Sequence, residues 1–342
     1  MQLSALLAAL FAAVVLALVV AGSQATEGAQ LSQEENSQEP PAWIGVAAKE
    51  NDPQTVELFE LKDEGKRQED NLVVFTLEHP NEHLSVDAFR CKPYGTFCTV
   101  LSTNQTHSWV YNVSMTAQVV QSTTQINALA YNAHIDKYTG AVITVALNGR
   151  SAVVSRVLNG KVESVVDIST FMNNNASIAP GGSTQCSNKN EMWIGIHRAT
   201  AEDLIVHVSL PSRKILGVQN ITDPLVTSMW ALCNNAINVN HLGGTLTLDD
   251  GLTVAYGVYD NQGHFVPSAS ASLSAERPGD LLRMTALLSQ PLRYDYFFGL
   301  YPEGTRPGDA AAGQLAFGYY NGHKSLKLAP IPFYLVGAAR LY

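Results

Sequence analysis

The chain has 342 residues, and its 30 Asp and Glu outweigh its 21 Lys and Arg, which gives a formal net charge of −9. This excess of negative charge disfavours nucleic acid or an anionic membrane surface as the partner. The four cysteines include no Cys-x-x-Cys motif, so a catalytic disulfide is disfavoured as well.

The N-terminus has the features of a secretory signal peptide. Residues 2–22 carry no charge, and Leu3–Val20 is a nearly unbroken apolar run. Ser23-Gln24-Ala25 then supplies the small-x-small pattern of a cleavage site. The alternative is an uncleaved anchor, because the run approaches a membrane-spanning length. No second hydrophobic segment follows, so residues 1–25 predict a secreted protein without a membrane span once the leader is removed.

Residues 26–42 are polar, acidic and poor in apolar side chains. Such a segment cannot bury enough surface to order itself, so it predicts a flexible stalk. The remaining residues, 43–342, are assigned to one domain because a repeat runs through all of them.

The repeat is visible first in the phrase Trp43-Ile44-Gly45-Val46, which returns as Trp193-Ile194-Gly195-Ile196. Similar apolar stretches are centred on Ile44, Phe97, Ile143, Ile194, Leu246 and Phe298. A second series, with nearly the same spacing, passes through Ala88, Ala130, Ala179, Ala231, Ala286 and Ala338. A period of about fifty residues built from short strands is typical of a β-propeller or a solenoid.

One unit shows its strands clearly. Three β-branched runs, Ala141–Leu147, Ser151–Leu158 and Lys161–Ile168, are separated by Asn-Gly dipeptides, which favour type I′ hairpin turns. A fourth run, Ile126–Tyr131, precedes them. Four antiparallel strands are the content of one propeller blade.

The two ends of the chain predict how the propeller closes. The first unit begins at its second strand, near Trp43, and the tail 332–338 falls where a seventh first strand is due. We therefore expect an all-β, six-bladed β-propeller of four-stranded antiparallel blades, in which the C-terminal strand completes the N-terminal blade. Seven blades, with a degenerate one in 168–192, are the alternative, and a pair of β-sandwiches is a more distant one.

The four cysteines are expected to form two structural disulfides in an oxidising compartment. Cys91 and Cys98 flank a predicted hairpin, and Cys186 and Cys233 fall at equivalent places of neighbouring units. These positions favour the pairs 91–98 and 186–233 among the three possible pairings, with buried free thiols as the alternative.

Four Asn-x-Ser/Thr sequons accompany the signal peptide, which indicates a glycoprotein. They begin at Asn104, Asn112, Asn175 and Asn220. Asn104, Asn175 and Asn220 are expected on loops of one face, so their glycans would crowd that face.

Oxygen-bearing residues just before the innermost strands form one candidate site. Counting back from the alanine series gives the candidate ligands Glu82, Asn173, Asp223 and Asp280. Their oxygens suit a hard cation such as calcium, and calcium-dependent six-bladed lactonases offer an analogy at the level of the fold only. Against a metal, the channel positions themselves are mostly apolar, so we expect no cofactor, with calcium as the alternative.

The remaining sequence patterns do not predict a catalytic site or a family. His79-Pro80-Asn81-Glu82-His83 spells a zinc-protease motif, but its proline and strand-like flanks predict a polar loop. The signatures of the WD, kelch and Asp-box families are absent, so the sequence predicts an architecture and no family. The favoured hypothesis is a secreted, monomeric, N-glycosylated module that binds an extracellular protein or glycan without catalysis. The alternative is a calcium-dependent hydrolase of lactonase or esterase type.

Overall fold

The chain divides into two units, Met1–Pro41 and Ala42–Tyr342. A computed structural model describes the second unit at residues 43–61, 67–79, 83–91, 95–136, 139–173, 176–186, 190–199, 201–223, 225, 228–233, 240–247, 253–272, 294–300, 313–320, 324–331 and 335–340. For β16, β17 and β20–β23 it describes the backbone. The predicted signal peptide and stalk lie outside the described residues.

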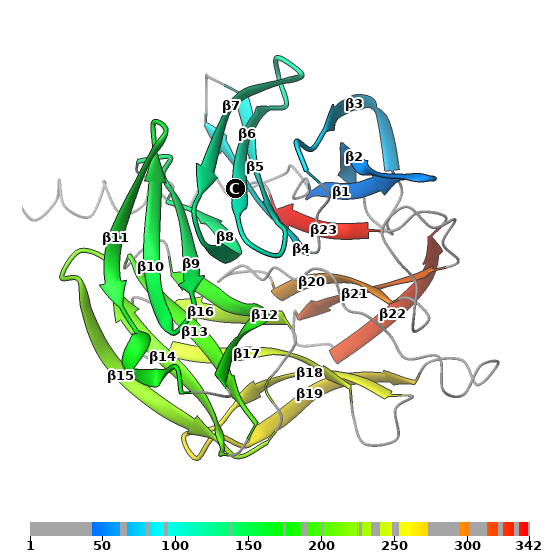
Figure 1. Cartoon of the computed structure of the whole chain (residues 1–342). Helices are drawn as coiled ribbons and strands as arrows, with labels where there is room; N and C mark the ends of the chain where they lie inside the picture. Colours follow the sequence, from blue (N-terminus) through cyan, green and yellow to red (C-terminus); the bar gives the residue numbers. More distant parts are fainter. Residues whose placement is uncertain are drawn as a thin grey trace, which may run out of the picture. The chain divides into compact units, whose positions relative to one another are not determined.

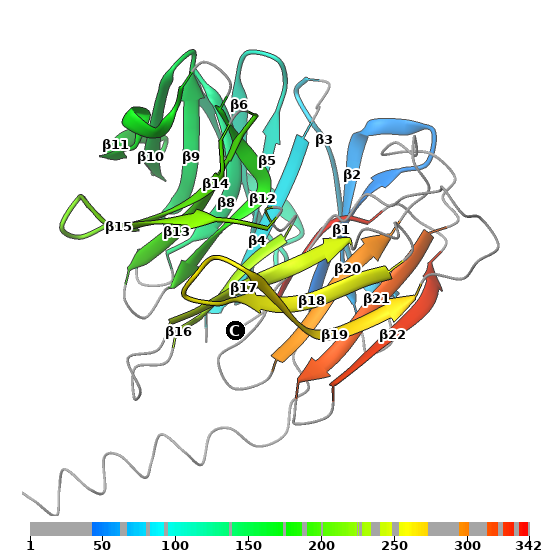
Figure 2. The ribbon, with the colours of Figure 1, turned by 90° about the horizontal axis from the view of Figure 1, so that it is seen from below.

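The described strands form six antiparallel sheets, which follow one another in chain order (Figures 1 and 2). Sheet A contains β23 (Leu335–Arg340), β1 (Trp43–Lys49), β2 (Asp52–Leu61) and β3 (Arg67–Thr76). Sheet B contains β4 (His83–Cys91), β5 (Gly95–Thr103), β6 (Ser108–Ser114) and β7 (Val119–Ile126). Sheet C contains β8 (Leu129–Ile135), β9 (Val142–Asn148), β10 (Ser151–Leu158) and β11 (Lys161–Asp167).

Sheet D contains β12 (Ala176–Cys186), β13 (Glu191–Arg198), β14 (Asp203–Ser209) and β15 (Lys214–Ile221). Sheet E contains β16 (Ser228–Cys233), β17 (Asn240–Thr247), β18 (Thr253–Tyr259) and β19 (Phe265–Ser272). Sheet F has three described strands, β20 (Tyr294–Leu300), β21 (Gly313–Tyr320) and β22 (Lys324–Ile331). The architecture is an all-β propeller of antiparallel sheets.

The two sequence series mark equivalent strands. The Trp-Ile-Gly series falls on β1, β5, β9, β13, β17 and β20, and the alanine series falls on the strands that neighbour them, β4, β8, β12, β16 and β23. Ala286 is outside the described residues. β20 thus corresponds to the second strand of its unit, and a sixth innermost strand at Ala286 stays a prediction.

The predicted pairing of the C-terminal strand with the N-terminal sheet is confirmed. β23 pairs antiparallel with β1, from Trp43 opposite Arg340 to Ala47 opposite Leu335. The N-terminal sheet is therefore completed by the C-terminal strand, which removes an exposed edge from each. In the stretch proposed as a degenerate seventh blade, β12 and β13 instead belong to sheet D.

The predicted meander is present as β9, β10 and β11, with one turn shifted. Asn148 pairs with Ser151, so the first loop is Gly149-Arg150 and not Asn148-Gly149. At the second loop Asn159 and Gly160 both have positive φ, as a type I′ turn requires. The preceding strand also begins later than predicted, because Ile126 ends β7 and β8 starts at Leu129.

The sheets pack face to face through aliphatic side chains. Sheets C and D share one large buried cluster: Ile143, Val145, Ala152, Val154, Val166, Ile168, Met172, Ile178, Met192, Ile194, Ile196, Leu204, Val206 and Val208. The period-two alternation of these strands places such residues on the faces that meet. The opposite face of sheet C packs on sheet B through a second buried cluster, which includes Val110 and Val157.

Side chains also join the innermost strands to one another. Ser85 and Asp87 of β4 accept hydrogen bonds from the backbone N–H groups of Ala133 and Ile135 in β8, at 3.0 and 2.6 Å. The Nε2 atom of His134 in β8 lies 3.0 Å from the Oγ atom of Ser183 in β12. Burial lowers the pKa of His134 to about 4, against a weaker opposing effect of Ser183, so this histidine is neutral at pH 7.

The predicted Cys91–Cys98 disulfide is wrong. Cys98 is a buried free thiol. Cys91 pairs with Gly95 and Cys98 with Ala88, so the two cysteines are three register positions apart along the hairpin. That offset corresponds to about 10 Å, beyond the about 7 Å that a disulfide tolerates between Cα atoms. Cys186 and Cys233 end β12 and β16, which contact each other, and their pairing stays a prediction.

Among the described residues there is no helix of the length and apolarity needed to cross a membrane.

Candidate protein-binding surface

Of the four predicted cation ligands, the structure describes Asn173 and Asp223. Asn173 is exposed beside a short 3-10 helix, Ser169–Phe171. The Asp223 carboxylate accepts a hydrogen bond from Phe265 N at 2.6 Å and lies 3.7 Å from His264 Nδ1. Glu82 and Asp280 lie outside the described residues, so the calcium site stays a prediction. The described side chains contain no group of three or more His, Cys, Asp or Glu that could hold a metal.

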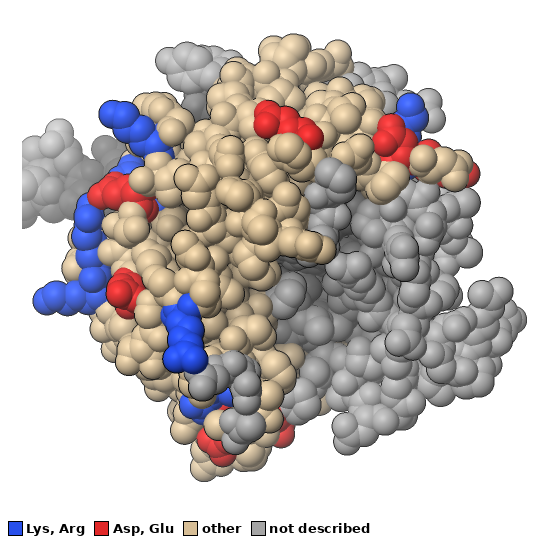
Figure 3. Space-filling model, viewed as in Figure 1, with Lys and Arg blue, Asp and Glu red and all other residues tan. Residues whose placement is uncertain are grey.

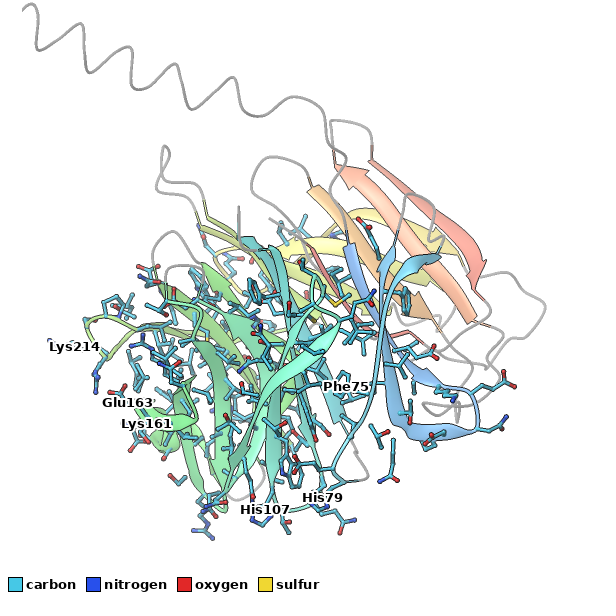
Figure 4. All side chains as sticks on the ribbon, turned by 90° about the horizontal axis from the view of Figure 1, so that it is seen from above. Phe75, His79, His107, Lys161, Glu163 and Lys214 are labelled. Atoms are coloured by element: carbon cyan, nitrogen blue, oxygen red, sulfur yellow. The ribbon has the colours of Figure 1, made fainter. Side chains whose placement is uncertain are left out.

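Of the zinc-protease pattern, the structure describes the two histidines. His79 follows β3, and His83 is the first residue of β4. The ring of His79 packs against Trp109, with centroids 4.5 Å apart, so it contacts an aromatic residue of sheet B. Figure 4 shows His79 and His107 at the same end of the molecule. Trp109 and Trp193 are both buried.

A different feature stands out on the surface: the outermost strand of sheet D, β15. Seven large hydrophobic side chains are exposed in the described part of the chain, and three lie on this strand: Ile215, Leu216 and Val218, at 37%, 49% and 46% exposure. β3, β7, β11 and β19 carry one each. Among the outer-strand residues whose side chains the structure describes, β15 therefore has the largest group of exposed aliphatic side chains.

Three of the other outer strands carry sequence features that discourage pairing with a foreign strand. β7 is a run of Ser, Thr and Gln between its ends, β11 begins with Lys161 and Glu163, and β19 contains Pro267. Between Ile215 and Val218, β15 has no charge and no proline. Among the described strands, none pairs with its outer side.

A β-bulge shapes β15. Ile215 pairs with Val208 and Gly217 with His207, so Leu216 has no partner on β14. Val208 and Val206, the partners of Ile215 and Val218, belong to the core shared by sheets C and D. Ile215 and Val218 thus lie on the same face of sheet D as this core, but at its outer margin, where the side chains are exposed.

The C-terminal end of β15 is fixed by sheet E. Gln219 Nε2 donates to Asp260 O at 2.9 Å, and Thr222 N donates to Gly263 O at 3.2 Å. The strand is therefore held at this end, while Lys214, Ile215, Leu216 and Val218 stay exposed. We call Lys161, Val162, Glu163, Arg213, Lys214, Ile215, Leu216 and Val218 the β15 surface.

Charged side chains lie at the N-terminal end of the β15 surface. Arg213 Nη2 donates to Glu163 Oε1, which links the turn before β15 to β11 of sheet C. Lys161 and Lys214 are also exposed there. Figure 3 shows Lys and Arg gathered on the left flank of the view, and Figure 4 shows Lys161, Glu163 and Lys214 on one side of the molecule. An acidic protein thus presents a locally basic edge.

The sequons differ in their surroundings. Asn104 lies in the β5–β6 turn, where its Oδ1 accepts from Thr106 N and His107 N, both at 2.8 Å. Asn112 lies within β6 and its carboxamide bonds to Thr99 and Ser122 on the neighbouring strands. Asn220 is exposed in β15, not in a loop as predicted, and Asn175 lies outside the described residues.

Sequence reasoning missed the β15 surface for a physical reason. Ile215, Leu216 and Val218 read as ordinary strand residues, and only the sheet order shows that this strand is outermost. The available signal was Arg213-Lys214 directly before an aliphatic run, a basic pair in an acidic chain.

No family model and no curated protein sequence matches the chain. Among solved structures it is similar to the β-propeller domain of Myceliophteria thermophila Cps50 (Swd1), with 7% identity, a TM-score of 0.46, and coverage of 87% of this chain and 89% of that one. Kuenenia stuttgartiensis hydrazine synthase gives 10% identity, a TM-score of 0.42, and coverage of 73% and 65%. Saccharomyces cerevisiae Sqt1 gives 10% identity, a TM-score of 0.39, and coverage of 84% of this chain and 68% of that one. At these values the likenesses carry no statement about what this chain binds.

Proposed function

We propose that this chain is a secreted, N-glycosylated β-propeller that acts by binding an extended segment of another protein along the outer edge of β15. The observation that carries the proposal is the exposed aliphatic row Ile215, Leu216 and Val218 on a terminal strand without a charge or proline in that row. Such an edge offers unpaired backbone N–H and C=O groups and a surface for alternate side chains, the two elements of strand addition.

The edge is suited to binding more than to protein stability. Full burial of an aliphatic side chain contributes about 1.5–3 kcal/mol, and an exposed side chain on β15 forgoes part of this free energy. A partner strand would cover them and satisfy the outer backbone groups in the same step. The bulge at Leu216 limits the register in which a partner can pair.

Secretion is supported by the sequence and by two sequons. The uncharged apolar leader 2–22 precedes a small-x-small cleavage pattern. Asn104 and Asn220 present carboxamides at the surface of the domain, where a glycan can be accommodated. The protein is expected in the medium of expressing cells.

The experiment is surface plasmon resonance with the secreted protein and a panel of short synthetic peptides that carry valine at alternate positions. The wild type should bind a subset of the peptides, and Leu216→Lys and Val218→Lys should weaken binding by about tenfold or more, about 1.4 kcal/mol. Val119→Lys is the matched control, because Val119 is an equally exposed valine on the outer strand of sheet B.

Circular dichroism and thermal melting of all three variants check that the fold is intact. The proposal is contradicted if no peptide binds in a manner that depends on Leu216, or if Val119→Lys weakens binding as much as Leu216→Lys.

A further inference from the structure

Arg156 lies at the boundary between sheets C and D, near the β15 surface. It belongs to β10, two positions after Val154, which packs in the core shared with sheet D. Side chains two apart on a strand share a face, so Arg156 is on the side of sheet C that faces sheet D. In the strand pairing it stands opposite Glu163 of β11.

Glu163, the carboxylate opposite Arg156, already pairs with another residue. Glu163 pairs with Arg213 of sheet D, and Arg156 forms no side-chain hydrogen bond or ion pair with the described residues. The Nε atom of Arg156 is buried without a partner. A buried guanidinium donor without an acceptor is unfavourable, because the lost hydration is not replaced.

The charge around this donor is unbalanced. Arg156 and the β15 surface together contain four cations, Arg156, Lys161, Arg213 and Lys214, and one acid, Glu163, in a chain whose net charge is −9. Cations that remain unpaired in this way attract a carboxylate and restrict which partners can approach. The aliphatic row of β15 begins directly after Lys214.

We propose that the strand bound on β15 is acidic, and that one of its carboxylates enters the C–D boundary and pairs with Arg156. This rests on the proposed function, since it names the chemistry of the same partner. Arg156 is then the residue that selects an acidic strand, while Leu216 and Val218 supply contact area. A guanidinium can meet a carboxylate with two parallel hydrogen bonds, which gives direction as well as energy.

The aliphatic row argues for a peptide over a sulfated polysaccharide. Both would satisfy the cations, but a sulfated sugar chain has no apolar side chains to cover Ile215, Leu216 and Val218. An extended peptide that alternates acidic and aliphatic residues matches both parts of the surface.

The experiment uses the full secreted protein and three short peptides, in which valine alternates with glutamate, with glutamine or with lysine, and a heparin oligosaccharide as a fourth probe. The glutamate peptide should bind best and the lysine peptide worst, and added salt should reduce this preference. Arg156→Gln should weaken the glutamate peptide by about tenfold and leave the glutamine peptide unchanged.

Arg150→Gln is the matched control, because it removes one exposed positive charge from the β9–β10 turn of the same sheet. It should change the affinity for the glutamate peptide by less than about twofold. Thermal melting separates binding from a structural role: since Arg156 has no partner to lose, Arg156→Gln should melt at the same or a higher temperature.

The outcomes distinguish the two proposals. Binding that depends on Leu216 but is equal for glutamate and glutamine peptides, or unaffected by Arg156→Gln, overturns the acidic-strand inference and leaves the β15 function standing. Peptide binding that does not depend on Leu216 overturns the proposed function itself. Heparin binding that needs Arg156 but not Leu216 assigns the cations to a sulfated sugar and overturns the inference.

Discussion

Arg213 and Glu163 form an ion pair that connects the turn before β15 to the outer strand of the neighbouring sheet. Both side chains are about half exposed, so the pair itself contributes only about 0–1 kcal/mol to stability. Its consequence is positional. It holds the start of β15 against β11 and leaves Arg156, which faces Glu163 across the strands, without an acid.

Removing the glycan from Asn220 should open the β15 surface. Asn220 pairs with Leu204, so it lies on the same face of β15 as Ile215 and Val218. A glycan there restricts the approach of a partner, and Asn220→Gln should raise the affinity for valine-alternating peptides a few-fold. Asn104→Gln, a sequon in sheet B, is the control and should leave affinity unchanged. Equal effects of both substitutions would contradict this arrangement.

The stability of the domain should fall as the pH drops below the ordinary pKa of histidine. Burial lowers the pKa of His134 from 6.5 to about 4, so the unfolded chain takes up a proton between these values and the folded protein does not. The contribution is complete above pH 6.5 and is lost as the pH falls towards 4. Between pH 7 and 5 the free energy of unfolding should decrease by at most about 2 kcal/mol from this residue.

Urea unfolding at the two pH values measures this difference. His134→Gln retains a hydrogen-bonding group for Ser183 but cannot titrate, so its pH dependence should be smaller by the same amount. An identical slope for wild type and variant would show that His134 is not the group responsible.

Cys98 should react with alkylating reagents only when the protein opens. Burial, and to a lesser extent the charge of Asp87, raises the pKa of the Cys98 thiol well above its usual value, so little reactive thiolate forms. Iodoacetamide labelling followed by peptide mapping should show Cys98 unmodified in the native protein and modified in urea. A non-reduced peptide in which Cys98 is linked to Cys91 would contradict the strand register.

Gly263→Ala should destabilise the protein markedly. Gly263 has a φ of +82°, and a Cβ added there would lie 2.2 Å from the carbonyl oxygen of Asn220. The substitution therefore strains the turn and pushes it off the end of β15, and we expect a loss of about 2 kcal/mol or more. Gly217→Ala is the control, because an added Cβ meets nothing within 4 Å. Chemical denaturation compares the two, and an equal loss in both would contradict the contact.

Much of the fold could be predicted because its information is periodic. The alanine and Trp-Ile-Gly series identified equivalent strands in successive sheets, and the half-unit at Trp43 predicted the pairing with β23. Register was harder. Sequence spacing suggested that Cys91 and Cys98 face each other, whereas the hairpin places Cys91 opposite Gly95. A tight turn fixes pairing residue by residue, and a spacing argument does not resolve that.

The candidate site was beyond the sequence for another reason. Exposure of Leu216 depends on β15 being last in its sheet, and the isolation of Arg156 depends on Glu163 being taken by a residue fifty positions away. Both are properties of neighbours that meet only in the folded chain. A local pattern reports the chemistry of a residue but not which partner it finds.

Hydrogen–deuterium exchange with the peptide of alternating glutamate and valine tests the central claim most directly. With the peptide bound, backbone amides in Lys214–Val218 should exchange more slowly, because the outer edge of β15 becomes covered and paired. The outer strand of sheet B, Val119–Ile126, should exchange at the same rate with and without peptide. Unchanged exchange in β15 under saturating peptide, or protection of another outer strand in its place, would contradict the account.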